Sequence, residues 1–324
     1  MTEQFPIAYA VKHSNLSIRM ESRSGGFFTL ISDIFLENNG VIYGCILDSE
    51  LNVIHIRTDN IDGRNKMRGS KYLQSDISLV YEQIKEDVVS GRSVLVTGTS
   101  CQISAIKAYL GKEYDNLFCL DIVCHGVPSK AVFNKYLDMV EKKKKAKCFD
   151  IDFRNKKDYG WMSHTETFLL KNKKDKVKRF DAEIFKNLFY AHDILRPSCY
   201  KCPYKSITHP SDITIADFWG IDKVLPEYFD NKGTSLVLIN SLKGMNYFEQ
   251  IVSNGKMQYK ICDIEQCMQP PLREPFPKPQ TREMFWKDFY NKPFAYIAKK
   301  YAGYSVLSNI KLVWHKLKYR IKNI

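Results

Sequence analysis

The feature that most constrains the fold is the alternation of apolar strands with helices over residues 76–128. The helical pattern DISLVYEQIKEDVVSG precedes the apolar strand SVLVTG, and a second helix, QISAIKAYLGK, precedes the strand NLFCLDIV. Strands that are joined through helices pair in parallel, and such sheets bind ligands at the carboxyl ends of their strands. We therefore predict a mixed α/β fold with a parallel-sheet core and a ligand site at that edge.

Further strands are predicted on both sides of this core. VIYGCILD and NVIHIR are separated by a short polar turn and are predicted to form a hairpin, after a helix that begins at the glycine pair of SGGFFTLISDIFLENNG. Residues 148–180 are predicted to form inserted antiparallel strands, and residues 181–195 a helix. DITIADFWG and SLVLIN are each predicted to be a strand.

Composition suggests where the domains end. Residues 269–280 hold five of the twelve prolines, and we interpret 269–281 as a linker. Residues 1–268 would then form the main domain, with the α/β core at about 1–145 and the antiparallel and cysteine-pair part at about 146–268. Residues 282–324 are predicted to form a basic, helical C-terminal appendage that packs separately.

The formal net charge of +13 is concentrated in two stretches. Residues 141–179 contain fourteen Lys/Arg and six acids, and residues 282–324 contain ten and two. Such patches attract an acidic protein, an anionic membrane surface or nucleic acid, but no nucleic-acid recognition motif accompanies them. The N-terminus lacks a signal-peptide pattern and no apolar run could span a bilayer. A cytoplasmic protein is expected, without a nucleic-acid partner and with peripheral membrane contact left open.

Four of the nine cysteines lie where an iron–sulfur cluster could be held. Cys101 and Cys124 each follow a predicted strand, and Cys199 and Cys202 form a CxxC pair in RPSCYKCPYK. Thiolates at strand ends together with a closely spaced pair can form a tetrahedral sulfur site. A zinc finger is not expected because a second CxxC and an HxxxH are lacking. The alternative for the pair is two unrelated buried thiols.

Cys101 also allows a second interpretation. It lies at a strand-to-helix turn, where the helix dipole stabilises a thiolate. With His125 as a base, it could be the nucleophile of a thiol enzyme that needs no metal.

Several polar or glycine-containing turns could bind a cofactor. Gly25 and Gly26 open a helix in the way that phosphate-binding turns do. The segment RGSKY offers the backbone and hydroxyl of Gly69 and Ser70, with Lys71 as a cation. Asp217, at the end of DITIADFWG, could bind a metal or cofactor. Ordinary turns and a capping aspartate are the alternatives.

Eight segments together resemble one family. They occur in the order and approximate spacing seen in the beta subunit of coenzyme F₄₂₀-reducing hydrogenase and its dehydrogenase relatives, over roughly residues 7–245. The family includes plant hydroxymethyl-chlorophyll reductase and many bacterial proteins from surface-polysaccharide loci. The segments are SRSGGFF, RGSKYLQSD, VLVTGTSCQISAIKAYL, LDIVCHGVPS, FRNKKDYGW, LRPSCYKCPY, SDITIADFWGI and GTSLVLIN.

The resemblance implies an oxidoreductase that carries FAD and a [4Fe–4S] cluster. The flavin would exchange a hydride with a small-molecule substrate, either coenzyme F₄₂₀ or another organic molecule such as an intermediate of polysaccharide biosynthesis. The cluster would exchange single electrons with a ferredoxin-like partner. By motif, the implied cluster ligands are Cys101, Cys124, Cys199 and Cys202. The implied flavin-binding positions are Ser24, Gly25, Gly26, Gly69, Ser70, Lys71, Tyr72, Gly98 and Thr99. The candidate catalytic residues are His125 and Asp217.

Three departures from the family pattern qualify these expectations. Ser100 and Ala216 stand where relatives have proline and glycine. The clustered cysteines of a ferredoxin-like segment are missing ahead of Cys45, so electrons are expected to come from a separate protein. A non-catalytic assembly factor of the same fold is therefore a third hypothesis, and a homo-oligomeric state is left open.

Overall fold

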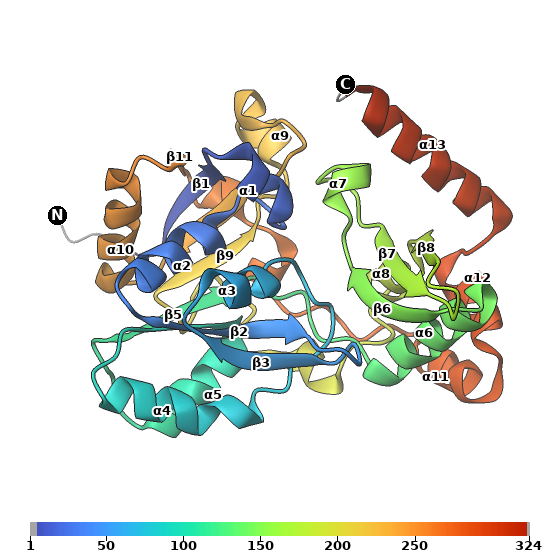
Figure 1. The fold of residues 1–324 in the computed structure, drawn as a ribbon, viewed down its shortest axis with the longest axis horizontal. Coiled ribbons are helices and arrows are strands. Elements are labelled where there is room, and N and C mark those ends of the chain that lie inside the picture. Colours follow the sequence, from blue (N-terminus) through green and yellow to red (C-terminus); the bar gives the residue numbers. More distant parts are fainter. Residues whose placement is uncertain (1–4, 323–324) are drawn as a thin grey trace.

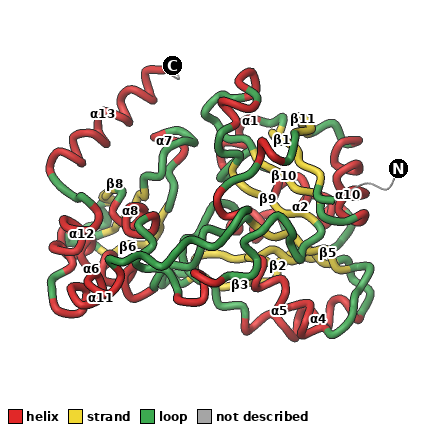
Figure 2. The backbone as a smooth tube through the Cα atoms, turned by 180° about the vertical axis from the view of Figure 1, so that it is seen from behind, coloured by secondary structure: helices red, strands yellow, loops and turns green. Residues whose placement is uncertain are grey.

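The computed structural model describes residues 5–322, and it has two lobes. The larger lobe is built on an eight-stranded sheet and the smaller on a three-stranded sheet (Figure 1). Most of the chain that passes between the lobes is loop (Figure 2). The predicted mixed α/β class is confirmed. Within the described residues, no helix combines the length and the apolar character needed to cross a membrane.

The eight-stranded sheet has the order β11-β1-β10-β9-β5-β4-β2-β3. Its centre, β2-β4-β5-β9, is parallel, and the strands beyond it on both sides pair antiparallel. The apolar run VLV is fully buried, as expected for a strand covered by helices on both faces. The strands are β1 (Ile7–His13), β2 (Val41–Leu47), β3 (Val53–Thr58), β4 (Val94–Thr99), β5 (Leu117–Ile122), β9 (Ile213–Asp217), β10 (Ser235–Ile239) and β11 (Met257–Cys262).

Helices cover both faces of this sheet. One face packs against α2 (Phe27–Glu37) and α10 (Leu242–Ser253), where Phe35 stacks on Tyr247 with ring centroids 5.1 Å apart. The other face packs against α4 (Tyr81–Val89) and α5 (Ser100–Leu110). The remaining helices of this lobe are α1 (Leu16–Glu21), α3 (Ile61–Met67) and α9 (Ile221–Val224). Short 3₁₀ helices occur at η1 (Ser78–Val80), η2 (Pro197–Lys201), η3 (Pro226–Tyr228), η4 (Glu265–Cys267) and η5 (Pro270–Leu272).

The smaller lobe contains the predicted antiparallel strands. Its sheet has the order β6-β7-β8, formed by β6 (Lys147–Asp152), β7 (Glu166–Lys171) and β8 (Val177–Ala182). Its helices are α6 (Lys130–Lys144), α7 (Lys156–Tyr159), α8 (Ile184–Tyr190), α11 (Arg282–Asn291), α12 (Phe294–Ala302) and α13 (Val306–Lys322).

The structure differs from the expected organisation of the C-terminal part. Phe285, Phe289 and Ile297 are fully buried in the same hydrophobic cluster as Phe133 and Phe168 of the smaller lobe. The helices α11 and α12 therefore complete this core, and only α13 projects from it (Figure 1). The proline-rich segment, which was expected to be a linker, packs against the protein. Leu272 is buried, and Gln269 Nε2 donates to the Asp217 carbonyl at 2.7 Å.

Candidate functional site

The candidate site lies at the edge where the parallel strands end. Because β4, β5 and β9 run in parallel, Cys101, Cys124 and Asp217 leave the sheet on the same side. β10 runs the opposite way, so its first residue, Ser235, pairs with Asp217. The topology thus gathers the predicted residues at one edge, where α/β sheets bind their ligands.

The four predicted cluster thiols form one group. Burial, with a smaller contribution from the thiolates of Cys101 and Cys199, raises the pKa of Cys124 to about 12. Burial also raises the pKa of Cys199, to which the thiolates of Cys202 and Cys101 contribute. Three distant stretches of chain therefore bring their sulfur atoms within electrostatic reach of one another.

This group is not a site for a single metal ion. Across residues 5–322, no three His, Cys, Asp or Glu side chains are arranged to hold one ion. An iron–sulfur cluster makes a different demand, because each thiolate ligates its own iron at a corner of the cluster and the sulfur atoms need not meet at one point.

Backbone N–H groups and one lysine favour negative charge on these sulfur atoms. The Gly126 N–H donates to Cys124, and the Val127 N–H donates to Cys199 Sγ at 3.4 Å. Lys205 donates to the His125 carbonyl at 2.7 Å, and its ammonium group interacts favourably with three of the thiolates. Hydrogen bonds to ligating sulfur tune iron–sulfur centres, so the donor set fits such a group.

Cys101 is the exposed member of the group. It lies in the first turn of α5, where Thr99 and Gln102 form a capping box, and its Sγ lies 3.2 Å from Thr99 Oγ1. Ser100 places its hydroxyl 3.1 Å from His209 Nδ1. The same nitrogen lies 2.9 Å from the buried carboxylate of Asp121, so Ser100 is anchored in a polar network beneath the cysteine.

His125 is engaged by other rings rather than by Cys101. Its Nε2 lies 2.8 Å from His192 Nε2, and its ring packs on Phe276 with centroids 4.3 Å apart. Burial, followed by the charge of His192, lowers the pKa of His125 to about 3. Within the described residues no hydrogen bond joins His125 to Cys101. The geometry therefore does not favour the nucleophile–base interpretation.

The Asp217 carboxylate lies between the guanidinium groups of Arg154 and Arg23. Arg154 Nη1 contacts this carboxylate at 2.5 Å, Arg23 Nε lies 3.6 Å away, and Trp161 Nε1 donates at 2.6 Å. Burial alone would raise the pKa of Asp217, but the charges of Arg154 and Arg23 hold it well below its usual range. The carboxylate stays ionised near neutral pH, which suits an anchoring role. Ala216 pairs with Leu236 in regular strand geometry, so this position needs no glycine.

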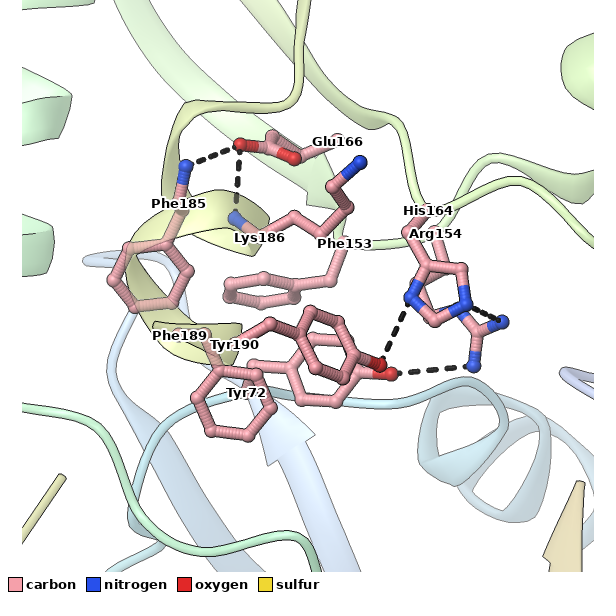
Figure 3. A pocket seen from close by; sticks show the side chains of 9 residues that line it. All are labelled: Tyr72, Phe153, Arg154, His164, Glu166, Phe185, Lys186, Phe189 and Tyr190. Atoms are coloured by element: carbon pink, nitrogen blue, oxygen red, sulfur yellow. Dashed lines mark hydrogen bonds between the residues drawn. The ribbon is translucent and has the colours of Figure 1, made fainter. Parts of the chain in front are cut away.

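A small cavity of about 10 Å³ lies beside Arg154 (Figure 3). At its polar end, Arg154 donates to His164 Nε2 at 2.9 Å and to the Tyr72 hydroxyl, and His164 Nδ1 lies 2.9 Å from the Tyr190 hydroxyl. Typical ligand pockets measure about 300–1,000 Å³, whereas this cavity has room for about one water molecule, so neither a flavin ring nor a substrate fits in it as it stands. Its lining residues are Tyr72, Phe153, Arg154, His164, Glu166, Phe185, Lys186, Phe189 and Tyr190.

The predicted glycine turn lies at the same edge of the sheet. Ser24 Oγ donates to the Thr234 carbonyl at 2.6 Å, and a Cβ on Gly25 would lie only 2.1 Å from the Val11 carbonyl oxygen. Gly26 has a φ of +95° and precedes α2. This close approach of backbones explains why glycine is needed there without a ligand.

Only some of the other predicted flavin-binding positions lie at the candidate site. Gly98 and Thr99 end β4 beside Cys101, and Tyr72 lines the cavity. Gly69 has a φ of +81° with open space around it, and Ser70 beside it is half-buried. Lys71 is otherwise engaged, because its Nζ donates to three carbonyls at the end of α3.

Sequence reasoning missed the cations and rings that surround the predicted residues. Arg23 and Arg154 lie within two of the family segments, and an arginine inside such a segment was the available signal. The sequence held no such signal for Phe276 and Lys205, because only the tertiary fold brings them to His125. There, Lys205 Nζ lies 4.0 Å from the centre of the Phe276 ring.

The fold and site define an α/β protein with a group of four thiols at the carboxyl edge of its sheet. The family model for the C terminus of the beta subunit of coenzyme F₄₂₀ hydrogenase/dehydrogenase matches residues 91–264. The chain belongs to this family, which confirms the resemblance found in the sequence and indicates an oxidoreductase that takes part in electron transfer.

A solved structure supports the fold independently. A chain in the xenon-derivatised F₄₂₀-reducing [NiFe] hydrogenase complex from Methanosarcina barkeri aligns with a TM-score of 0.51 at 19% identity. The alignment covers 80% of this chain and 85% of that one. No curated protein matches the sequence.

Proposed function

We propose that the protein is an FAD- and [4Fe–4S]-dependent oxidoreductase. It passes electrons between a ferredoxin-like carrier and a small organic substrate, either coenzyme F₄₂₀ or an intermediate of surface-polysaccharide assembly. The observation that carries the proposal is the group formed by Cys101, Cys124, Cys199 and Cys202.

The residues of the chain would hold and insulate these cofactors. A bound cluster supplies one-electron exchange and a bound flavin supplies hydride exchange. The four cysteines would ligate the cluster, while the N–H groups of Gly126 and Val127 and the charge of Lys205 offset its negative charge. Arg154, fixed by Asp217 at the end of β9, supplies a positive charge that would favour an anionic or reduced ring bound near this edge of the sheet.

The partner and compartment follow from charge and thiol chemistry. The solved relative is part of a hydrogenase complex, which supports the idea that this chain also works with another protein. An acidic electron carrier would be attracted by the excess of positive charge. All nine cysteines are free, which supports a reducing compartment such as the cytoplasm.

The decisive experiment is to measure iron and sulfide in protein purified without oxygen. We expect about four irons per wild-type chain. Cys199→Ser should lose most of this iron. Cys148→Ser is the matched control, because Cys148 lies on β6 of the smaller lobe, where its Sγ donates to the Asp150 carbonyl at 3.2 Å. Iron-free wild-type protein, or equal iron loss in both variants, would contradict the cluster proposal.

Flavin content is measured on the same samples and tests the other half of the proposal. We expect one FAD per chain. A protein with iron but no flavin would retain the cluster proposal and refute the flavin proposal. A protein without either, isolated in a stoichiometric complex with a partner, would instead support the assembly-factor hypothesis.

A further inference from the structure

The C-terminal helix α13 presents a long apolar stripe to solvent. Its members recur at helical spacing, so that they share one face of the helix. Their exposed fractions range from 47% to 76%, which is unusual for so many neighbouring apolar side chains. The stripe consists of Val306, Leu307, Ile310, Val313, Trp314, Leu317 and Ile321.

The opposite face of α13 docks on the smaller lobe. Leu312 is buried, Arg320 Nη2 contacts Asp158 at 2.8 Å, and the ring of His315 lies 5.9 Å from that of Tyr159. The helix runs along the outside of this lobe beside α7 (Figure 1). Because these contacts fix the orientation of the helix, the apolar stripe points away from the protein.

The stripe is bordered by positive charge. α13 contains five Lys/Arg and no Asp or Glu. At 100° per residue, Lys311, Lys318 and Lys322 follow one another along one border of the stripe. An exposed apolar stripe with a tryptophan and flanking lysines is the pattern of helices that lie in a membrane interface.

A second basic surface adjoins the beginning of the helix. Lys143 Nζ donates to the Tyr304 hydroxyl at 2.9 Å, two residues before α13, and Lys178 Nζ donates to the Lys144 carbonyl at 3.1 Å. The lysine-rich end of α6 and the β7-β8 hairpin therefore extend the positive field of α13. Such a field attracts the anionic headgroups of phospholipids.

We propose that α13 docks the protein on an anionic phospholipid membrane, with its apolar stripe in the headgroup region and its lysines on the lipid phosphates. A second copy of the chain fits less well, since pairing two such helices would place like charges side by side. The site is independent of the thiol group and of the proposed redox function.

The test is co-sedimentation of the full-length protein with vesicles. Wild type should bind vesicles that contain phosphatidylglycerol and bind pure phosphatidylcholine at least tenfold more weakly. Trp314→Glu and Leu317→Glu should each reduce binding to the anionic vesicles by more than tenfold. Lys318→Gln should weaken it about fivefold, and added salt should weaken wild type further.

Leu242→Glu is the matched control, because Leu242 is 65% exposed on α10, in the other lobe. It should bind as wild type does. Circular dichroism and gel filtration of each variant establish that the fold and oligomeric state are retained. Wild type that ignores anionic vesicles, or a Trp314→Glu variant that still binds them, overturns the proposal. So does a wild-type dimer that Trp314→Glu dissociates, since the stripe would then be an interface between copies.

Discussion

Two buried carboxylates near the cavity show how local partners decide the charge state of a residue. Asp217 lies against the guanidinium groups of Arg154 and Arg23, and it remains ionised although it is buried. Glu166 accepts from the backbone N–H groups of Phe185 and Lys186, and no cation among residues 5–322 forms an ion pair with it. Burial raises its pKa to about 8. Both side chains are buried, so pairing with cations, rather than burial, accounts for the difference between their pKa values.

Glu166 therefore makes stability depend on pH. Its pKa is 4.5 when exposed and about 8 in the fold, so the folded state holds a proton that the unfolded state releases above pH 4.5. The stability that protonated Glu166 contributes to the fold is fully present below pH 4.5 and is lost as pH rises through 8. We expect wild type to lose on the order of a few kcal/mol across this range, and Glu166→Gln to lose less. Urea melts at intervals from pH 5 to 8 measure both; parallel curves would contradict this.

At the scale of elements, the sequence predicted strands that have a local pattern better than strands and contacts that depend on distant parts of the chain. The hairpin of β2 and β3 and the antiparallel strands β6 to β8 are confirmed, because alternation and turn residues are local signals. β11 was missed, since MQYKIC becomes a strand only by pairing with β1. The edge that holds Cys101 and Cys124 was predictable from strand order, whereas Arg154 and Phe276 reach the site only through tertiary contacts.

The proline-rich segment illustrates the limit of composition. Phe276 stacks on His192 with centroids 4.2 Å apart, and Leu272 is buried, so the segment is held at the candidate site. We expect trypsin to cleave slowly after the exposed Arg273, and Phe276→Ala to be cleaved several-fold faster because about 1 kcal/mol of ring contact is lost. Tyr290→Ala, at a largely exposed ring on α11, is the control. Rapid cleavage of wild type would instead restore the linker interpretation.

At the scale of the molecule, buried polar contacts hold the two lobes together. Lys156 of the smaller lobe donates to the carbonyls of Arg19, Ser24 and Lys232 in the larger lobe, at 2.5–3.1 Å. Burial lowers the pKa of Lys156 to about 6, whereas donation to three carbonyls requires the ammonium form with its three N–H groups. Since Ser24 belongs to the glycine turn, this contact joins the orientation of the lobes to the geometry of the site.

The C-terminal helices contribute unequally to the whole, and truncation separates their roles. A chain that ends at Thr281 loses Phe285, Phe289 and Ile297 from the core of the smaller lobe. Each buried side chain contributes about 2–5 kcal/mol, so the loss approaches the roughly 5–15 kcal/mol that stabilises a typical domain. We expect this chain to unfold or aggregate. A chain that ends at Gly303 loses chiefly Leu312 and surface ion pairs with Asp158. Its circular dichroism should lose only the helical signal of α13, and it should melt cooperatively only a few degrees lower. Equal thermal stability of both truncated chains would show that α11 and α12 are an appendage after all.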